Sequence, residues 1–264
     1  MNKPKYIVPA LICLLFYNNI AKAVTNNPFL NNDTVYLPQF KQRGGNPYIT
    51  NNVSIDIIKS KANQGDVVAQ LALGLLYGLG ERIPLDHKKA AYWFQKAANQ
   101  GDEKAQLLLG LAYYDGAGID KDDSKAFFWY QKAANQGQPI AQLKLGSMYY
   151  EGEGTSQNYI KAKEYFQKAA NQGHVVALVN LGVMYDTGRG TPKDFIKAKK
   201  YFEKAISKGS SEAKMKLGIM YFLGEITPKD NAKALELFEQ FCKESPKECN
   251  RTIQSMMLQL RNSR

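Results

Sequence analysis

The chain has few of the side chains from which catalytic and metal sites are usually built. Its 264 residues include two histidines, three cysteines and two tryptophans. Neither His87 nor His174 stands at a metal-ligand spacing from a cysteine or an aspartate. No Gly-x-Ser-x-Gly or phosphate-loop pattern occurs. We therefore expect no enzymatic activity, no cofactor, no catalytic residues and no bound metal.

Long apolar runs are also scarce, and the one at the N-terminus has the features of an export signal. The run Tyr6–Tyr17 follows lysines and precedes Ala21-Lys22-Ala23, a small-x-small pattern. It is too short to span a bilayer as a stable helix, which disfavours an uncleaved anchor. Cys13 lacks the preceding small residue that a lipoprotein site needs. We predict a signal peptide over residues 1–23, cleaved after Ala23, and a periplasmic or secreted protein without a transmembrane segment.

Acidic residues are outnumbered by basic ones. The chain carries 35 Lys and Arg against 24 Asp and Glu, a formal net charge of +11. Such a surface could attract nucleic acid or anionic envelope polymers. The lysines are scattered rather than clustered, which favours a solvated face, and we expect no nucleic-acid partner.

An internal repeat dominates what the chain does contain. Five positions recur every 36 residues through five copies, and in the first copy they are Ala69, Gly74, Tyr77, Gly80 and Ala90. Five columns in register are the mark of a repeat architecture.

The first helix of each copy, helix A, is expected over about 66–77 in the first repeat. Ala69 and Gly74 are small enough to let a neighbouring helix approach closely. A mid-helix glycine costs about 1 kcal/mol in propensity, so close packing must offset it. Tyr77 lies on the same stripe and is expected to fill the space that the small residues leave. The helix is expected to end at Gly80 in a left-handed turn.

The second helix, helix B, is expected to begin at a recurring Asp or Asn, because that side chain caps the free N–H groups of a first turn. These residues are Asp86, Asp122, Asn158, Asp194 and Asp230. Helix pairs of this kind bury their apolar faces only by stacking on neighbours. We expect an all-α fold, a right-handed α/α superhelical solenoid of helix pairs.

The expected domain organisation follows from the repeat. An Asn- and Pro-rich flexible leader spans 24–53, and the solenoid spans 54–245. The solenoid consists of a lone helix and the repeats 66–101, 102–137, 138–173, 174–209 and 210–245. The C-terminal segment 246–264 is expected to form a capping helix over about 247–261. Its covering residues would be Ile253, Met257 and Leu260.

The repeat motif resembles a known family. Leu73-Gly-x-x-Tyr77 with Ala90-x-x-x-Phe94 is similar to tetratricopeptide repeats. The 36-residue period and loops such as Gly116-x-Gly118 resemble the Sel-one-like repeat (SLR), a close relative. Arg82 and Ile226 replace the second loop glycine in the first and last copies, so those loops are expected to differ. The resemblance implies an α/α superhelix that acts as an adaptor in protein complexes and, in bacteria, is often exported.

Two cysteines remain after removal of the signal peptide. Cys242 and Cys249 occupy small-residue columns on either side of a turn, where two backbones lie close. In an exported protein this favours a disulfide over two packed thiols, and it would staple the cap.

Helix A lines the concave surface in tetratricopeptide-like proteins, so its apolar positions off the Ala-Gly-Tyr stripe are candidates for a protein-binding groove. They are Leu71, Leu107, Tyr114, Leu143, Tyr150, Val179, Val183, Met215 and Phe222. The alternative is that the solenoid buries these rows itself.

The function these observations favour is a monomeric, non-enzymatic scaffold for other proteins, in envelope regulation or host interaction. Two alternatives remain. One is the β-lactamase or penicillin-binding activity described for cysteine-rich relatives, although only one cysteine pair and no serine-lysine motif occur here. The other is binding of anionic envelope polymers through the lysines.

Overall fold

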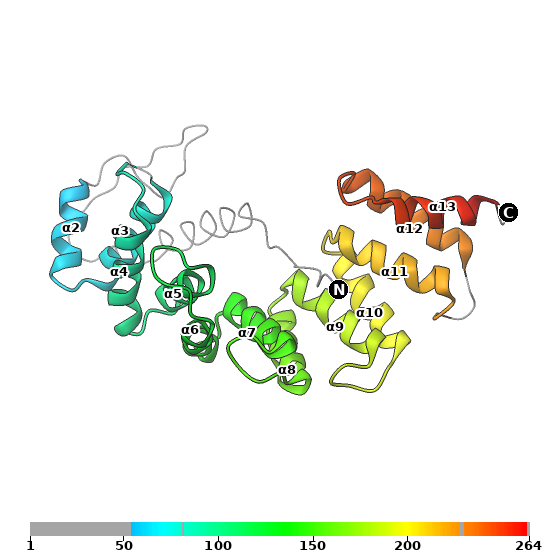
Figure 1. Ribbon diagram of the computed structural model, residues 1–264, viewed down its shortest axis with the longest axis horizontal. Coiled ribbons are helices and arrows are strands. Elements are labelled where there is room, and N and C mark those ends of the chain that lie inside the picture. Colours follow the sequence, from blue (N-terminus) through cyan, green and yellow to red (C-terminus); the bar gives the residue numbers. More distant parts are fainter. Residues whose placement is uncertain (1–53, 81, 227–229, 263–264) are drawn as a thin grey trace. The chain divides into compact units, whose positions relative to one another are not determined.

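The computed structural model describes residues 54–80, 82–226 and 230–262. Those residues form twelve helices and no strand (Figure 1). The prediction of an all-α repeat fold is confirmed. The expected signal peptide and leader lie outside the described residues.

The helices alternate between the two predicted types. After the lone helix α2 (Ile55–Asn63), helix A of successive repeats is α3 (Val67–Leu79), α5 (Glu103–Asp115), α7 (Pro139–Glu151), α9 (Val175–Thr187) and α11 (Ser211–Leu223). Helix B is α4 (His87–Asn99), α6 (Asp123–Asn135), α8 (Tyr159–Asn171), α10 (Phe195–Ile206) and α12 (Asn231–Glu244), and α13 (Arg251–Asn262) follows. The chain forms two compact units, unit 1 up to Ala133 and unit 2 from Ala134.

Every helix B begins at the predicted capping residue. The Asp or Asn side chain accepts a hydrogen bond from the backbone N–H three residues later, at 2.8–3.0 Å in all five repeats. These bonds, together with the lysine side chain at the same position, hold the pKa values of Asp86, Asp122 and Asp194 below the usual range. The start of helix B is therefore set locally, by one side chain in each repeat.

The helix A glycines allow close packing, but the group that fills the space is not the one predicted. A Cβ on Gly74 would lie 2.6 Å from the ring of Phe94, and one on Gly146 would lie 2.5 Å from Phe166. The other repeats pair Gly110 with Tyr130, Gly182 with Phe202, and Gly218 with Phe238. A buried ring from helix B of the same repeat thus occupies the space assigned to Tyr77. Tyr77 itself is half-buried, with Lys89 Nζ 5.2 Å from its ring centre.

The second loop glycine has a structural reason that the sequence did not reveal. A Cβ on Gly118 would lie 2.1 Å from the backbone oxygen of His87, so the loop packs directly on the first turn of α4. Gly190 lies similarly close to the start of α8. Arg82 takes the same left-handed conformation, with φ 65°, at a cost of about 1–2 kcal/mol. Ile226 is buried and has no positive φ, so only the last of the two glycine-free loops departs from this backbone conformation.

Glutamines join neighbouring repeats; Gln70 and Gln142 are buried, whereas Gln100 and Gln172 are exposed. Gln70 donates to a carbonyl at the end of α2 at 3.1 Å. Gln100 donates to the side-chain oxygen of Gln70 at 2.8 Å and to the carbonyl of Gly65 at 3.0 Å. Gln142 and Gln172 repeat the arrangement in unit 2. Each of the four amides therefore adds a hydrogen bond to a carbonyl group at the end of an earlier helix or in the turn that follows it.

The last repeat is closed by α13 and a disulfide. Ile253 and Leu260 are buried against Phe238 and Phe241 of α12, and Met257 is half-buried. Cys242 and Cys249 are joined, with their Cα atoms 4.9 Å apart, which is an ordinary spacing for a disulfide. The bridge links the end of α12 to the turn before α13.

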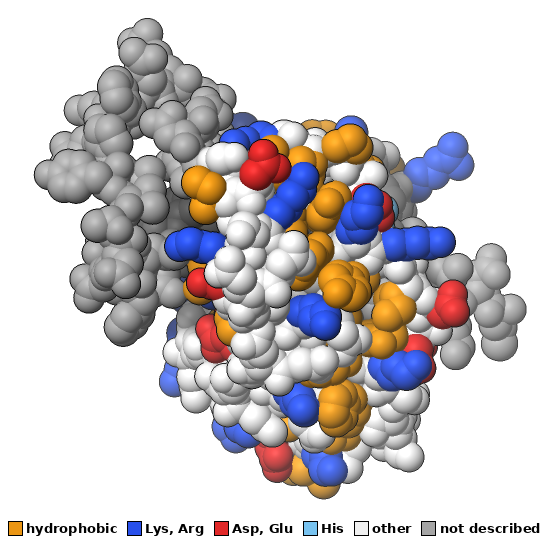
Figure 2. Space-filling model, turned by 90° about the vertical axis from the view of Figure 1, so that its left-hand side faces the viewer, with side chains coloured by type: hydrophobic (Ala, Val, Ile, Leu, Met, Phe, Trp, Pro, Cys, Tyr) orange, Lys and Arg blue, Asp and Glu red, His pale blue; other side chains and the backbone are white. Residues whose placement is uncertain are grey.

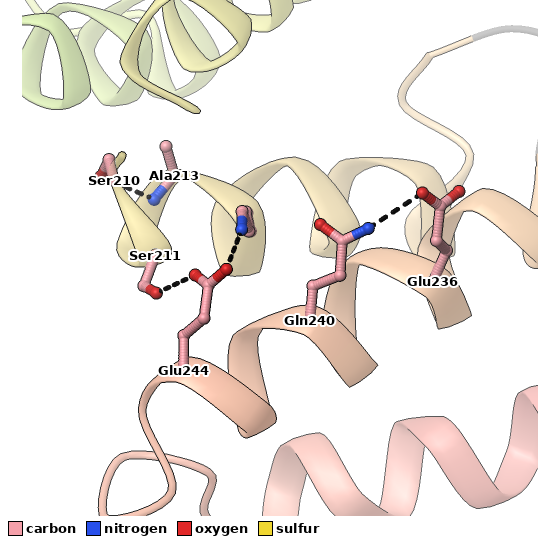
Figure 3. A network of polar contacts seen from close by, with 7 residues as sticks. Ser210, Ser211, Ala213, Glu236, Gln240 and Glu244 are labelled. Carbon is pink, nitrogen blue, oxygen red and sulfur yellow. Dashed lines mark hydrogen bonds and ion pairs between the residues drawn. The ribbon is translucent and has the colours of Figure 1, made fainter. Parts of the chain in front are cut away.

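A polar network joins α11 to α12 on the surface of the same repeat (Figure 3). The carboxylate of Glu244 accepts from Ser211 Oγ at 2.5 Å and pairs with Lys214. Both partners lower the pKa of Glu244. Lys214 occupies the column of Gln70 and Gln142, so an ion pair replaces the glutamine contact in the last repeat.

Candidate protein-binding surface

The structure divides the nine predicted groove residues into two sets. Four lie in the core with an exposed fraction of 8% or less: Leu71, Leu107, Leu143 and Val179. Buried side chains cannot contact a partner, so the prediction of an open groove is wrong for this row.

Met215 is the last member of this row, and its contacts show why the other four residues are buried. Met215 of α11 packs against the apolar cluster that α12 and α13 form with Phe238 and Ile253. This column of helix A therefore faces the next helices of the array. The period placed these residues correctly on one row, but it could not tell a row between helices from a row facing solvent.

The remaining five predicted residues are half-buried: Tyr114, Tyr150, Val183, Met215 and Phe222. Tyr114 lies beside Lys121, whose Nζ is 5.2 Å from its ring centre. Phe222 lines a hollow of about 520 Å³ whose other walls come from α13.

The outward side of helix A lies one position further along the chain than the buried row that ends at Met215. In unit 2 it reads Ile140, Lys144, Ser147 and Glu151 on α7, then Val176, Asn180, Val183 and Thr187 on α9, then Glu212, Lys216, Ile219 and Leu223 on α11. All of these are half-buried or exposed. The spacing of four, three and four is a helical stripe, and we call it the outward stripe. The sequence signal for it was the polar column Lys144, Asn180 and Lys216, which the prediction overlooked.

The outward stripe of unit 2 continues onto α13. Thr252, Ser255 and Gln259 stand one period after Lys216, Ile219 and Leu223. Together with Phe222, Arg251 and Met256 they line the 520 Å³ hollow. The cap therefore extends the surface as well as covering the core.

An arginine is held at the edge of this surface. Arg189 Nη1 donates to the hydroxyl of Tyr150 at 2.6 Å, and its guanidinium lies 5.4 and 5.8 Å from the ring centres of Tyr150 and Tyr159. Burial raises the pKa of Tyr150, while the hydrogen bond to Tyr150 raises the pKa of Arg189. Both groups keep their protons at neutral pH, so the pair presents a fixed cation.

A pair of carboxyl groups lies in the same unit. Burial raises the pKa of Asp186 and of Glu225, and the neighbouring carboxyl group of Asp186 raises the pKa of Glu225 further. One oxygen of Asp186 is buried without a hydrogen-bond partner. The positive charges of Lys193 and Lys216 lower the pKa of Asp186. Such a pair favours sharing a proton over carrying two charges.

Within the described ranges, no three His, Cys, Asp or Glu side chains gather in a way that could hold a metal ion. In the same ranges, none of the helices combines the length and apolar character needed to cross a bilayer.

Comparison with known proteins identifies the repeat. The family model described as Sel1 repeat matches residues 67–102, 103–138, 139–174, 175–210 and 211–245. No curated protein matches the chain.

Solved structures agree. A Sel1 repeat protein from Oxalobacter formigenes is 35% identical, with a TM-score of 0.68 over 72% of this chain and 76% of that one. The protein c5321, a protective antigen of uropathogenic Escherichia coli with an SLR fold, is 28% identical with a TM-score of 0.55. That match covers 74% of this chain and half of the Escherichia coli protein. Five matched repeats and this likeness show that the chain belongs to the Sel1 repeat family.

Proposed function

We propose that this protein is an exported, non-enzymatic scaffold that binds an extended segment of another protein along the outward stripe of unit 2. Sel1 repeat proteins generally mediate protein–protein interaction, and they generally act as scaffolds rather than catalysts. The proposal extends that general role to particular residues.

The observation that carries the proposal is the polar column of the outward stripe. Lys144, Asn180 and Lys216 stand at one equivalent position of three successive helices A. Val183 lies one turn after Asn180 on α9, and Ile219, which also packs against the apolar cluster of α12 and α13, lies one turn after Lys216 on α11. Evenly spaced donors beside small apolar contacts suit a chain in extended conformation, whose carbonyl groups and side chains alternate.

Export and contact with the cell envelope or a host are part of the same proposal. The N-terminal signal pattern supports export. The similar Escherichia coli protein is a protective antigen. A disulfide between Cys242 and Cys249 suits an oxidising compartment. Fractionation of the native cells should place the protein outside the cytoplasm with its first residue at Val24.

The test is site-specific photo-crosslinking in the native cells. A photoreactive residue in place of Asn180 should give a discrete crosslinked protein band. The same residue in place of Lys200, on helix B, should give none. The double change Lys144→Glu and Lys216→Glu should reduce crosslinking from position 180 at least tenfold, because it reverses two charges on the stripe.

Two results would contradict the proposal. Equal crosslinking from positions 180 and 200 would show that the outward stripe is not the preferred contact. A charge-reversed protein that keeps its helical circular dichroism and still crosslinks fully would show that the polar column does not bind the partner.

A further inference from the structure

The two helix types differ sharply in charge. Helices α3, α5, α7, α9 and α11 carry four lysines and five acidic residues. Helices α4, α6, α8, α10 and α12 carry fourteen lysines and six acidic residues. The positive charge of the repeats is therefore concentrated on helix B, where the proposed protein-binding stripe does not lie.

The same helices expose apolar side chains in register. Ile160 is 62% exposed and Ile196 is 79% exposed, and each is the second residue of its helix, α8 or α10. The hydroxyl of Tyr201 donates to Gln167 at 2.8 Å, so α8 and α10 lie side by side. A single exposed isoleucine is ordinary on a protein surface. Two at the same position of adjacent helices form the start of a patch.

Three lysines that form no ion pair with a described residue stand within about two turns of these isoleucines, alongside Glu164 and Glu203 on the same two helices. Lys163 lies one turn after Ile160, and Lys200 lies one turn after Ile196, with Lys204 one turn further. None of the three lysines forms an ion pair with any residue that the structure describes. Lys204 stands in the last turn, where it also complements the helix dipole. That explanation does not extend to Lys163 or Lys200, which lie mid-helix. We call the two isoleucines and the three lysines the isoleucine–lysine patch.

Unit 1 carries a similar pattern on its own helices B. Tyr92 of α4 and Phe128 of α6 are exposed at equivalent positions. Lys96 and Lys132 lie one turn later, with their Nζ atoms 5.4 and 4.8 Å from the respective ring centres. Figure 2 looks onto the side that carries α2 and shows apolar side chains running in a band among lysines. Exposed apolar groups beside lysines thus recur in both units.

We propose that the isoleucine–lysine patch docks unit 2 on the surface of an anionic lipid bilayer. The lysines would lie against lipid phosphates, and the isoleucines would enter the boundary between headgroups and acyl chains. A polyanionic sugar polymer or a nucleic acid would pair with the lysines, but it offers nothing to an aliphatic side chain. Isoleucine gains free energy only by leaving water, and an acyl layer provides that environment. The proposal does not depend on the proposed function, since the outward stripe is left unused.

The test is sedimentation of the purified full chain with lipid vesicles at low salt. Vesicles of equal parts phosphatidylglycerol and phosphatidylcholine should bind the protein, whereas vesicles of phosphatidylcholine alone should not. The double variant Ile160→Ser and Ile196→Ser should lower the partition coefficient by about tenfold. The triple variant Lys163→Gln, Lys200→Gln and Lys204→Gln should lower it at least as much.

A matched control is available on helix A. Val176 is 48% exposed and Leu223 is 58% exposed, both on the outward stripe. The change of both to serine removes similar apolar surface and should leave vesicle binding unchanged. All of the changed side chains are at least partly exposed, so circular dichroism should show an intact fold in each variant.

Several results would overturn the proposal. The wild-type chain could fail to bind the anionic vesicles. The lysine variant could lose binding while the isoleucine variant keeps it, which would assign the patch to anionic polymers in general. The helix A control could lose as much binding as the isoleucine variant, which would show that any exposed apolar residue contributes equally.

Discussion

Units 1 and 2 share their packing but differ in what helix A shows to solvent. In both units a helix A glycine packs against a helix B ring, and glutamine side chains donate to carbonyl groups of an earlier helix or of the turn that follows it. In unit 1 the outward stripe of α3 reads Val68, Ala72, Leu75 and Leu79, and Leu75 is buried. In unit 2 the repeat position of Ala72 is polar and holds Lys144, Asn180 and Lys216. Contacts with neighbouring helices restrict which residue types fit at the packing positions, whereas the outward positions accept different residue types in the two units.

Reduction of the disulfide should have the largest effect, and only in unit 2. The bridge closes a loop of about eight residues, for which chain entropy gives a stabilisation of about 2–3 kcal/mol. The double variant Cys242→Ala and Cys249→Ala should therefore speed amide hydrogen exchange in α12 and α13. Peptides from α3 to α5 should exchange as in the wild type. Equal acceleration in both units would show that they unfold as one cooperative body.

The helix A glycines should be equally sensitive in the two units. Gly110→Ala and Gly146→Ala each place a methyl group within 2.6 Å of a ring, which should cost about 1–3 kcal/mol despite the better helix propensity of alanine. Urea denaturation should show both losses. Adding Phe166→Leu to Gly146→Ala should restore part of the stability. A stabilised single variant would mean that the ring moves aside without cost.

The carboxyl pair should make unit 2 sensitive to pH in a way that unit 1 is not. The pKa values of Asp186 and Glu225 are raised, so their contribution to stability is full below the unfolded values near 4 and is lost as pH rises through the folded values. Asp186→Asn should raise the melting temperature at pH 7 by about 2–4 °C, for about 1 kcal/mol. This increase in melting temperature should become smaller as the pH falls toward 4.

The control comes from unit 1, where Tyr114 occupies the repeat position of Asp186. Tyr114→Phe should change stability by the same amount at both pH values. A pH-independent effect of Asp186→Asn would show that the two carboxyl groups do not share a proton.

The smallest expected effect is on catalysis. Purified protein should hydrolyse nitrocefin no faster than buffer alone, because neither unit is expected to contain a reactive centre. A rate that rises with protein concentration and disappears in a heat-denatured sample would favour the β-lactamase alternative over the scaffold.

Sequence reasoning reached the fold because its signals were local or strictly periodic. Capping residues such as Asp86 bond within one turn, and the spacing of Gly74 and Gly110 fixes the repeat. It failed where the answer depended on the angle between helices. Leu71 and Ala72 are adjacent, and only the packing of neighbouring helices decides which of them faces solvent. The ring that fills the glycine space was missed for the same reason.

The glutamine contacts have a consequence for how such a chain can evolve. The donor and acceptor of each contact are separated by 30 or 35 residues in both units. A gene that gains or loses one whole copy recreates every such pair, whereas a single inserted residue within a helix misaligns them. Unequal recombination between copies can therefore lengthen or shorten the protein while each junction stays satisfied.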